Sequence, residues 1–262
     1  MSIGIVKSAI TGQFFGAVKS NKCSIVNSYY QGANVNGSAS TVTLGTQEAT
    51  NVTDEQLATA EVVLGLGVAF RQDLGADAYP TLNTTKPVVV KITDAGYATL
   101  FVDNADLTVP AGVKAYTAEF ESTWLKLNAV EGAIAAAEPV VLKGAAGIYS
   151  FVPTTGAVKA EGNVLKGAAD DIAANGLYIL AQPQDKPVGF YKSTTGTIKA
   201  GKAYLASSND VKAFLFSGDD ATGISNLNAN LNANGAIFNL AGQRMSKMQK
   251  GINIVAGKKV LK

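Results

Sequence analysis

Aromatic side chains in the middle of the chain are the residues whose type and spacing best fit ligand binding. Exposed aromatic rings on a β-scaffold offer a flat apolar surface with a polar edge, which is typical of glycan-binding sites. Trp124 is the single tryptophan, and it alternates with Lys126 while Leu125 and Leu127 take the opposite strand face. This alternation favours an exposed Trp124, although covering a core or a sheet edge is the commoner role of tryptophan. The candidate ligand contacts are Trp124, Tyr116 and Tyr191.

Paired carboxylates are the second type of residue with chemical potential, because glycoside hydrolases place two of them around the bond that they cleave. Aspartate pairs at 170–171 and 219–220 lie in polar, turn-like runs, and Glu119 and Glu121 share one strand face. All of these positions are typical of solvated surfaces. Calcium requires about six to eight converging oxygens, and no glutamate follows residues 219–220 at loop spacing. We therefore expect no catalytic residues and no metal site.

Composition excludes further classes of site. The 262 residues contain no histidine and one cysteine, which excludes Ser-His-Asp and Cys-His catalysis, imidazole-ligated metals and an internal disulfide. The net charge of +2 provides no general attraction for nucleic acid. No glycine-rich run fits a phosphate-binding loop, and no window approaches about 18 uninterrupted apolar residues. We predict no enzymatic activity, no cofactor, no nucleic-acid partner and no membrane-spanning segment.

Short strands between turns must position these residues. Runs of about 4–7 residues that are rich in Val, Ile, Tyr and Phe are bounded by turn residues. They span residues 87–93, 98–102, 115–120, 139–142, 177–181, 188–191, 203–206 and 211–216. The intervening stretches lack helical periodicity, which excludes β-α-β units. We predict a mainly β protein, with an antiparallel β-sandwich or barrel-like domain over residues 87–216.

The N-terminal region combines one helix with a repetitive pattern. Thr53 and Gln56 form a capping-box pattern. Leu57, Ala60 and Leu64 then recur at helical spacing, and Gly65 and Gly67 end the helix. Before this helix, glycines punctuate short apolar pieces, as in the rungs of a repetitive β-structure. About three rungs are needed to bury a continuous face, so we expect the chain to begin within a longer array. Residues 1–86 are thus predicted to end a β-solenoid-like array that the helix caps.

The C-terminal region has two parts of different composition. Residues 217–236 are polar and turn-rich, which predicts a linker. Residues 237–262 contain six basic residues and no acidic one, and three strand-like runs. We predict a basic β-hairpin module with a turn around Gly257. Apart from Phe238 no aromatic residue accompanies these charges, which argues against nucleic-acid binding.

Two short sequence echoes occur in the middle region. Residues 142–146 recur at 165–169 as Leu-Lys-Gly-Ala-Ala, and residues 109–116 are similar to 198–204. Small residues make chance matches easy, so duplication of a strand-turn unit stays open. Residues 130–137 are also open, between one helical turn and a loop.

Three segments, in this order, resemble the C-terminal regions of large surface proteins of Bacteroidota. The first resembles the end of GLUG-type adhesin repeat arrays and comprises Tyr29-Tyr30 and residues 42–46, 53–66 and 70–82. The second resembles the β-domain that follows such arrays and comprises residues 92–100, 140–144 and 188–192. The third resembles a C-terminal sorting-type tail and comprises residues 237–244 and 250–255. Phe70 and Ala256 depart from the family pattern, which often has Trp and Asn there.

The resemblance implies a cell-surface or secreted, adhesin-like protein without assigned catalytic residues. Its parts are a repeat-array end, a β-domain, a linker and a sorting-type tail over residues 1–86, 87–216, 217–236 and 237–262. The implied partners are a surface glycan or protein, and the secretion or anchoring machinery that acts on the tail. The alternative function is a carbohydrate-binding module that uses the aromatic residues of the middle β-domain.

Overall fold

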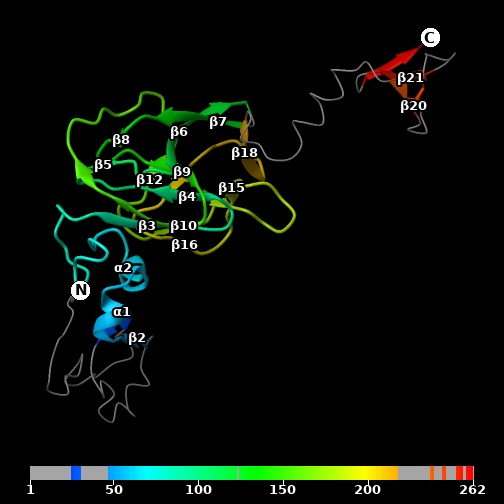
Figure 1. The fold of residues 1–262 in the computed structure, drawn as a ribbon. Helices are drawn as coiled ribbons and strands as arrows, with labels where there is room; N and C mark the ends of the chain where they lie inside the picture. The colour runs from blue at the N-terminus through cyan, green and yellow to red at the C-terminus, as the bar shows by residue number, and fades with distance from the viewer. Residues whose placement is uncertain are drawn as a thin grey trace.

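Residues 88–217 fold into a β-rich unit, which we call the body. A curved nine-stranded sheet forms most of it (Figure 1). The computed structural model describes residues 25–30, 47–122, 124–217, 237–238, 244–245, 252–255 and 258–261, and within them the protein is mainly β, as predicted. The strand order is β12-β17-β14-β15-β18-β7-β6-β9-β4. The strands are β4 (Tyr97–Leu100), β6 (Val113–Glu121), β7 (Trp124–Val130), β9 (Val140–Gly144), β12 (Lys166–Gly167), β14 (Tyr178–Ala181), β15 (Gly189–Lys192), β17 (Ala203–Leu205) and β18 (Ala213–Ser217).

The two ends of this sheet approach each other and nearly close a barrel. Edge strand β4 contacts β17 near the opposite edge. Phe101, directly after β4, donates its backbone N–H to the carbonyl of Gly201 at 2.9 Å. The Phe101 ring also lies against Gly167 of β12, where an added Cβ atom would stand 2.0 Å from the ring. The absence of a side chain at Gly167 therefore lets the ring cover the seam between the edges.

One pair of neighbouring strands in this sheet is parallel. β18 and β7 run in the same direction, whereas every other neighbouring pair is antiparallel. The predicted antiparallel arrangement is wrong at this one joint. Strands β7, β6, β9 and β4 form one antiparallel unit of the sheet, and strands β12, β17, β14, β15 and β18 form the other. The parallel pair of β18 and β7 joins the two units.

Shorter sheets complete the body. β3 pairs with β10, β5 lies between β11 and β8, and β13 pairs with β16, all antiparallel. Residues 130–137, left open between helix and loop, contain strand β8. The bounds are β3 (Val88–Ile92), β5 (Asp106–Thr108), β8 (Ala133–Ile134), β10 (Gly147–Phe151), β11 (Pro153–Thr154), β13 (Ile172–Ala173) and β16 (Thr197–Ile198).

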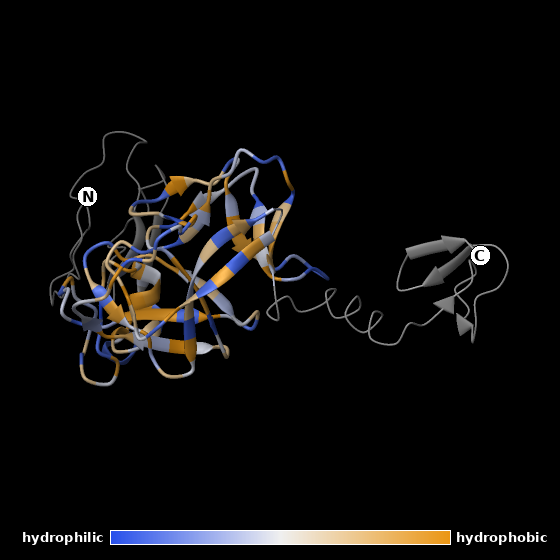
Figure 2. Ribbon diagram, turned by 90° about the horizontal axis from the view of Figure 1, so that it is seen from above, coloured by the Kyte–Doolittle hydropathy of each residue, from blue (hydrophilic) through white to orange (hydrophobic). Residues whose placement is uncertain are grey.

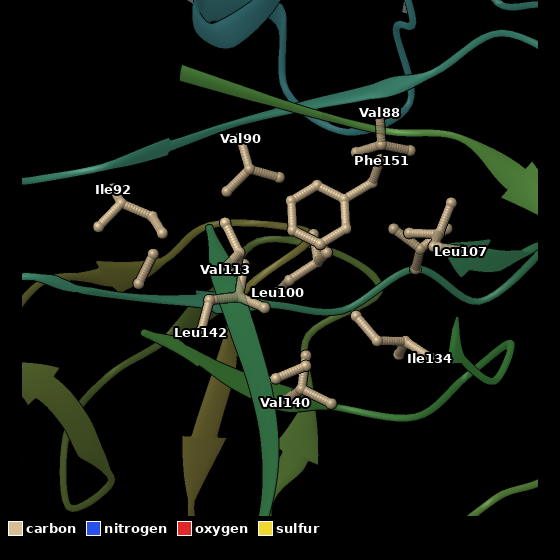
Figure 3. Close-up of a cluster of buried hydrophobic side chains, with 13 residues drawn as sticks. Val88, Val90, Ile92, Leu100, Leu107, Val113, Ile134, Val140, Leu142 and Phe151 are labelled. Carbon is tan, nitrogen blue, oxygen red and sulfur yellow. The ribbon is translucent and has the colours of Figure 1, made fainter. Parts of the chain in front are cut away.

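Two hydrophobic cores lie on opposite faces of strands β4, β6 and β9. Figure 3 shows the first core, in which Phe151 of β10 lies among side chains of β3 and β5. The first core comprises Val88, Val90, Ile92, Ala98, Leu100, Val102, Leu107, Val113, Ala115, Ile134, Val140, Leu142 and Phe151. The second core, inside the barrel, comprises Tyr116, Ala118, Leu125, Val141, Leu165, Tyr178, Val188, Phe190, Leu205, Phe214 and Phe216.

Strand β9 shows how one strand serves both cores. Val140 and Leu142 face the first core and Val141 faces the second, and all three are fully buried. In β7, by contrast, buried Leu125 lies between exposed Trp124 and Lys126, and Figure 2 shows hydrophobic and hydrophilic residues following one another along strands of the body. A strand with both faces covered loses that alternation.

The predicted N-terminal helix is divided into α1 (Asp54–Leu57) and α2 (Ala60–Leu66). The capping box is present: the Thr53 hydroxyl accepts from the N–H of Gln56, and the Gln56 side chain accepts from the N–H of Thr53. Thr59 interrupts the helix with extended backbone angles, φ −90° and ψ 162°. Its hydroxyl donates to the carbonyl of Gln56 at 2.7 Å. Threonine favours such positions because its hydroxyl competes for backbone hydrogen bonds.

Residues on both sides of the predicted boundary at 86 pack against each other. Helix α2 contacts β3 through a small apolar cluster. Arg71 is 1% exposed, and its guanidinium donates to the carbonyl of Thr84 at 2.5 Å and to the side chain of Asn104. These contacts attach the segment before β3 to the body.

The echoed segments have the same local structure. Gly112 and Gly201 both have a φ of +82°, and in each turn the next residue donates its N–H to the carbonyl three positions earlier at 3.2 Å. This is a type II turn, whose third residue requires a positive φ. β6 and β17 follow these turns and pair with β9 and β12, which carry the other echo. The echoes therefore occupy equivalent places in the two halves of the sheet.

The predicted solenoid, linker and hairpin module fall mainly outside the described residues. β1 (Ile25–Tyr30) and β2 (Gln47–Asn51) pair in parallel, but residues 1–24 and 31–46 are not described. Residues 218–236 and the expected turn at 256–257 also lie outside. Short C-terminal strands pair in the order β20-β19-β21-β22, with bounds β19 (Ile237–Phe238), β20 (Arg244–Met245), β21 (Ile252–Val255) and β22 (Lys258–Leu261). Solenoid, linker and hairpin module stay predictions.

Two aspartates tie loops of the body together. The carboxylate of Asp106 accepts from the backbone N–H of Ala136 at 2.7 Å and of Ala157 at 3.0 Å, and these bonds hold the pKa of Asp106 below its ordinary value. Asp171 accepts from the ammonium of Lys199 at 2.8 Å. This bond, with one from a backbone N–H, lowers the pKa of Asp171.

We expect the protein to lose stability in acid. A carboxyl whose pKa is lower when folded stabilises the fold above its unfolded pKa, about 3.9 for aspartate. That stabilisation is lost as the pH falls through the folded value. Melting temperatures measured from pH 7 down to about pH 2.5 should therefore fall most steeply below about pH 4. Asp106→Asn should make this decline shallower, and an unchanged decline would contradict the role given to Asp106.

Candidate ligand-binding surface

The hairpin of β6 and β7 places Trp124 at the start of β7, opposite Glu121 of β6. Trp124 is 42% exposed, whereas the next residue, Leu125, is fully buried in the second core. Successive strand residues point to opposite faces, so Trp124 lies on the face of the sheet directed away from the barrel interior. We call this the outer face.

Two further strands contribute to the outer face beside Trp124. Across the parallel joint Trp124 is opposite Leu215 of β18, and the neighbouring strand β15 places Tyr191 opposite Ala213. Phe190 of β15 is fully buried in the second core, so Tyr191 points outward. Trp124 and Tyr191 are two strands and two residues apart, which places their Cα atoms about 12 Å from each other.

Leu215 lies on the strand between those that carry the two aromatic residues. Its partner in β15 is Gly189, and a Cβ atom added to Gly189 would stand 2.8 Å from Cδ2 of Leu215. The Leu215 side chain therefore lies over the glycine. Trp124, Leu215 and Tyr191 together form an apolar strip across three adjacent strands.

Tyr191 is held in place by its hydroxyl. The phenol donates to the carbonyl of Pro187 at 2.7 Å, and partial burial raises the pKa of Tyr191. Its ring is half-buried. The hydroxyl is thus committed to the protein, and the ring is the part of Tyr191 that a ligand can contact.

A charged pair borders the apolar strip. Glu119 and Lys126 are opposite each other in β6 and β7, with 3.9 Å between Oε2 and Nζ, and their side chains are 45% and 57% exposed. On the far side of Glu119 a loop passes close by: a Cβ atom added to Gly162 would lie 3.4 Å from Oε1 of Glu119.

Asn163 fixes this loop against β6. Its side-chain oxygen accepts from the N–H of Ala118 and of Leu165, each at 3.2 Å. Its amide donates to the carbonyl of Pro139 at 2.9 Å and to the buried carboxylate of Glu138. The loop beside Glu119 is therefore held by an interlinked set of hydrogen bonds.

Of the three candidate ligand contacts, the structure brings Trp124 and Tyr191 together on the outer face and separates Tyr116 from them. Tyr116 is 8% exposed and belongs to the second core. It shares the face of β6 that also carries buried Ala118, so it points into the barrel. We therefore omit Tyr116 from the surface. Leu215, which sequence reasoning did not select, takes part because of the parallel joint.

The carboxylate pairs considered in the sequence lie in different parts of the structure, and one member of each described pair lies beside a lysine. Asp171 is engaged with Lys199, Glu119 lies beside Lys126, and the aspartates at 219–220 lie outside the described residues. Among the described residues no group of three or more His, Cys, Asp and Glu side chains is gathered closely enough to hold a metal ion. The helices in the described part of the chain are too short to cross a membrane.

No protein-family model, no curated protein and no solved structure matches this chain.

Proposed function

We propose that this chain is a non-enzymatic, adhesin-like region of a cell-surface or secreted protein, and that its β-body binds glycans through the outer face. The observation that carries the proposal is the exposure of Trp124 on an open sheet face, 42% of the residue. An indole ring left in water next to a leucine and a tyrosine forms an apolar platform on which the C–H face of a sugar ring can stack.

The shape of the surface supports a glycan rather than a small buried ligand. Trp124, Leu215 and Tyr191 lie along neighbouring strands of one sheet, which makes an extended surface. The strip of about 12 Å between the aromatic Cα positions suits an oligosaccharide chain laid across the strands. Polar contacts are available beside the strip from Glu119 and Lys126.

The remainder of the proposal rests on the sequence resemblance. Residues 1–86 would belong to the end of an adhesin repeat array that carries the β-body, and residues 237–262 would present a basic tail to the secretion or anchoring machinery. A surface location gives the outer face access to glycans of a host or of neighbouring bacteria.

The Trp124→Ala variant should lose glycan retention while its melting temperature stays nearly unchanged. The ring is exposed, so little packing is lost, but stacking on an aromatic ring contributes about 1–3 kcal/mol to binding in the comparable case of bases on aromatic side chains. Retention would be measured by affinity electrophoresis of the whole chain in gels containing soluble plant or bacterial polysaccharides.

A matched control lies on the same hairpin. Phe120 is 40% exposed but is directed to the barrel side, where its ring centroid is 5.1 Å from that of Phe214. Phe120→Ala should lower the melting temperature and leave retention intact. A large melting shift in Trp124→Ala would make Trp124 a packing residue, and retention unchanged by that variant would refute the proposed binding face.

A further inference from the structure

The charged pair beside Trp124 has unused hydrogen-bonding capacity. The 3.9 Å between Glu119 and Lys126 exceeds the usual length of about 2.7–2.9 Å for a charge-assisted hydrogen bond. An ammonium offers three donors and a carboxylate about four acceptor positions. Because exposed ion pairs contribute only about 0–1 kcal/mol, a ligand can rearrange this pair at little cost.

The charges around Trp124 are unfavourable to an anionic ligand. Glu121 lies directly opposite Trp124 in the hairpin. Glu119 lies two residues before Glu121 in β6, on the same face of the strand. Lys126 is the basic residue beside these two carboxylates, and its charge is partly balanced by Glu119, which lies opposite it. A carboxylated sugar stacked on Trp124 would therefore meet two carboxylates and one partly neutralised ammonium.

From this arrangement we infer that the outer face selects uncharged glycans, with Glu119 accepting from sugar hydroxyls and Lys126 donating to them. The inference rests on the proposed function and names the ligand class for the same surface. The loop at Gly162, tied down through Asn163, limits how far the Glu119 side chain can turn away from the strip.

The single tryptophan makes the test direct. Emission of Trp124 in the whole chain would be titrated with a neutral β-linked glucose oligosaccharide and with an oligogalacturonate of the same length. We expect the neutral sugar to shift the emission and the uronate to bind at least about tenfold more weakly. Glu119→Gln and Lys126→Gln should each weaken neutral binding about tenfold, because a neutral amide replaces the charged partner of a hydrogen bond.

The matched control variants are Lys114→Gln, at an exposed position of β6, and Glu131→Gln, at the exposed position directly after β7. Both should leave binding unchanged. Melting temperatures of all four variants should match that of the wild type. Equal or tighter binding of the uronate, or no effect of Glu119→Gln and Lys126→Gln, would overturn the inference and leave the proposed glycan binding standing. No emission change with either sugar, together with undiminished retention by Trp124→Ala, would overturn both.

Discussion

Replacing Phe151 or Phe190 by alanine is expected to lower the free energy of unfolding by about 3–5 kcal/mol, and each variant should still unfold in one transition. Both side chains are fully buried, Phe151 in the first core and Phe190 in the second. Removing either ring forfeits its transfer from water and leaves a cavity that neighbouring strands fill only in part.

A single transition is expected because strands β6 and β9 contribute side chains to both cores. Val140 and Leu142 pack in the first core and Val141 in the second, so β9 cannot leave one core without leaving the other. β6 has the same arrangement, with Ala115 facing one core and Ala118 the other. Unfolding of either core therefore exposes strands β6 and β9, against which the other core packs.

The measurement is denaturant unfolding followed both by circular dichroism and by the fluorescence of Trp124, whose neighbour in the chain, Leu125, is buried in the second core. Coincident curves for Phe151→Ala, shifted to lower denaturant with an unchanged slope, would fit one cooperative unit. An early change in circular dichroism that Trp124 does not register would show instead that the first core unfolds by itself. Val158→Ala, at an 89% exposed position, is the control and should move neither curve.

Gly201→Ala is expected to be the most costly of the glycine substitutions in the turns, at about 2–5 kcal/mol. A φ of +82° costs a residue with a side chain about 1–2 kcal/mol. In addition, the new Cβ would lie 2.5 Å from both Cγ atoms of Val68, and overpacking of this kind costs about 1–3 kcal/mol.

Gly176 separates these two contributions. It has nearly the same φ, +79°, in a turn with the same hydrogen-bond pattern, but nothing stands within 4 Å of an added Cβ. Gly176→Ala should therefore cost only the conformational part, about 1–2 kcal/mol. The difference between the two variants measures the contact between Val68 and the turn before β17.

The experiment is thermal or denaturant unfolding of Gly176→Ala, Gly201→Ala and the double variant Val68→Ala/Gly201→Ala. Truncation of Val68 should recover part of the loss caused by Gly201→Ala, since residues in contact are not additive. Equal costs at the two glycines, without recovery, would mean that the segment before β3 is not packed on this turn.

Local patterns determined about half of the strands of the body, and the presentation of Trp124. Each of the eight predicted strand runs overlaps an observed strand of the body, because β-branched and aromatic residues between turn residues favour extended backbone whatever lies beside them. The capping box at Thr53 is likewise complete within four consecutive residues. The alternation of Trp124 and Lys126 with buried Leu125 follows from the two-residue period of a strand.

Only the tertiary structure decided which residues accompany Trp124. Tyr116 and Ala115 are both buried, because β6 separates two cores, and alternation cannot distinguish inside from outside when both faces are covered. Leu215 and Tyr191 reach the outer face beside Trp124 through the parallel joint of β18 and β7. That joint pairs strands from distant parts of the chain, and the residues within either strand carry no local signal of which partner, or which direction, the other will take.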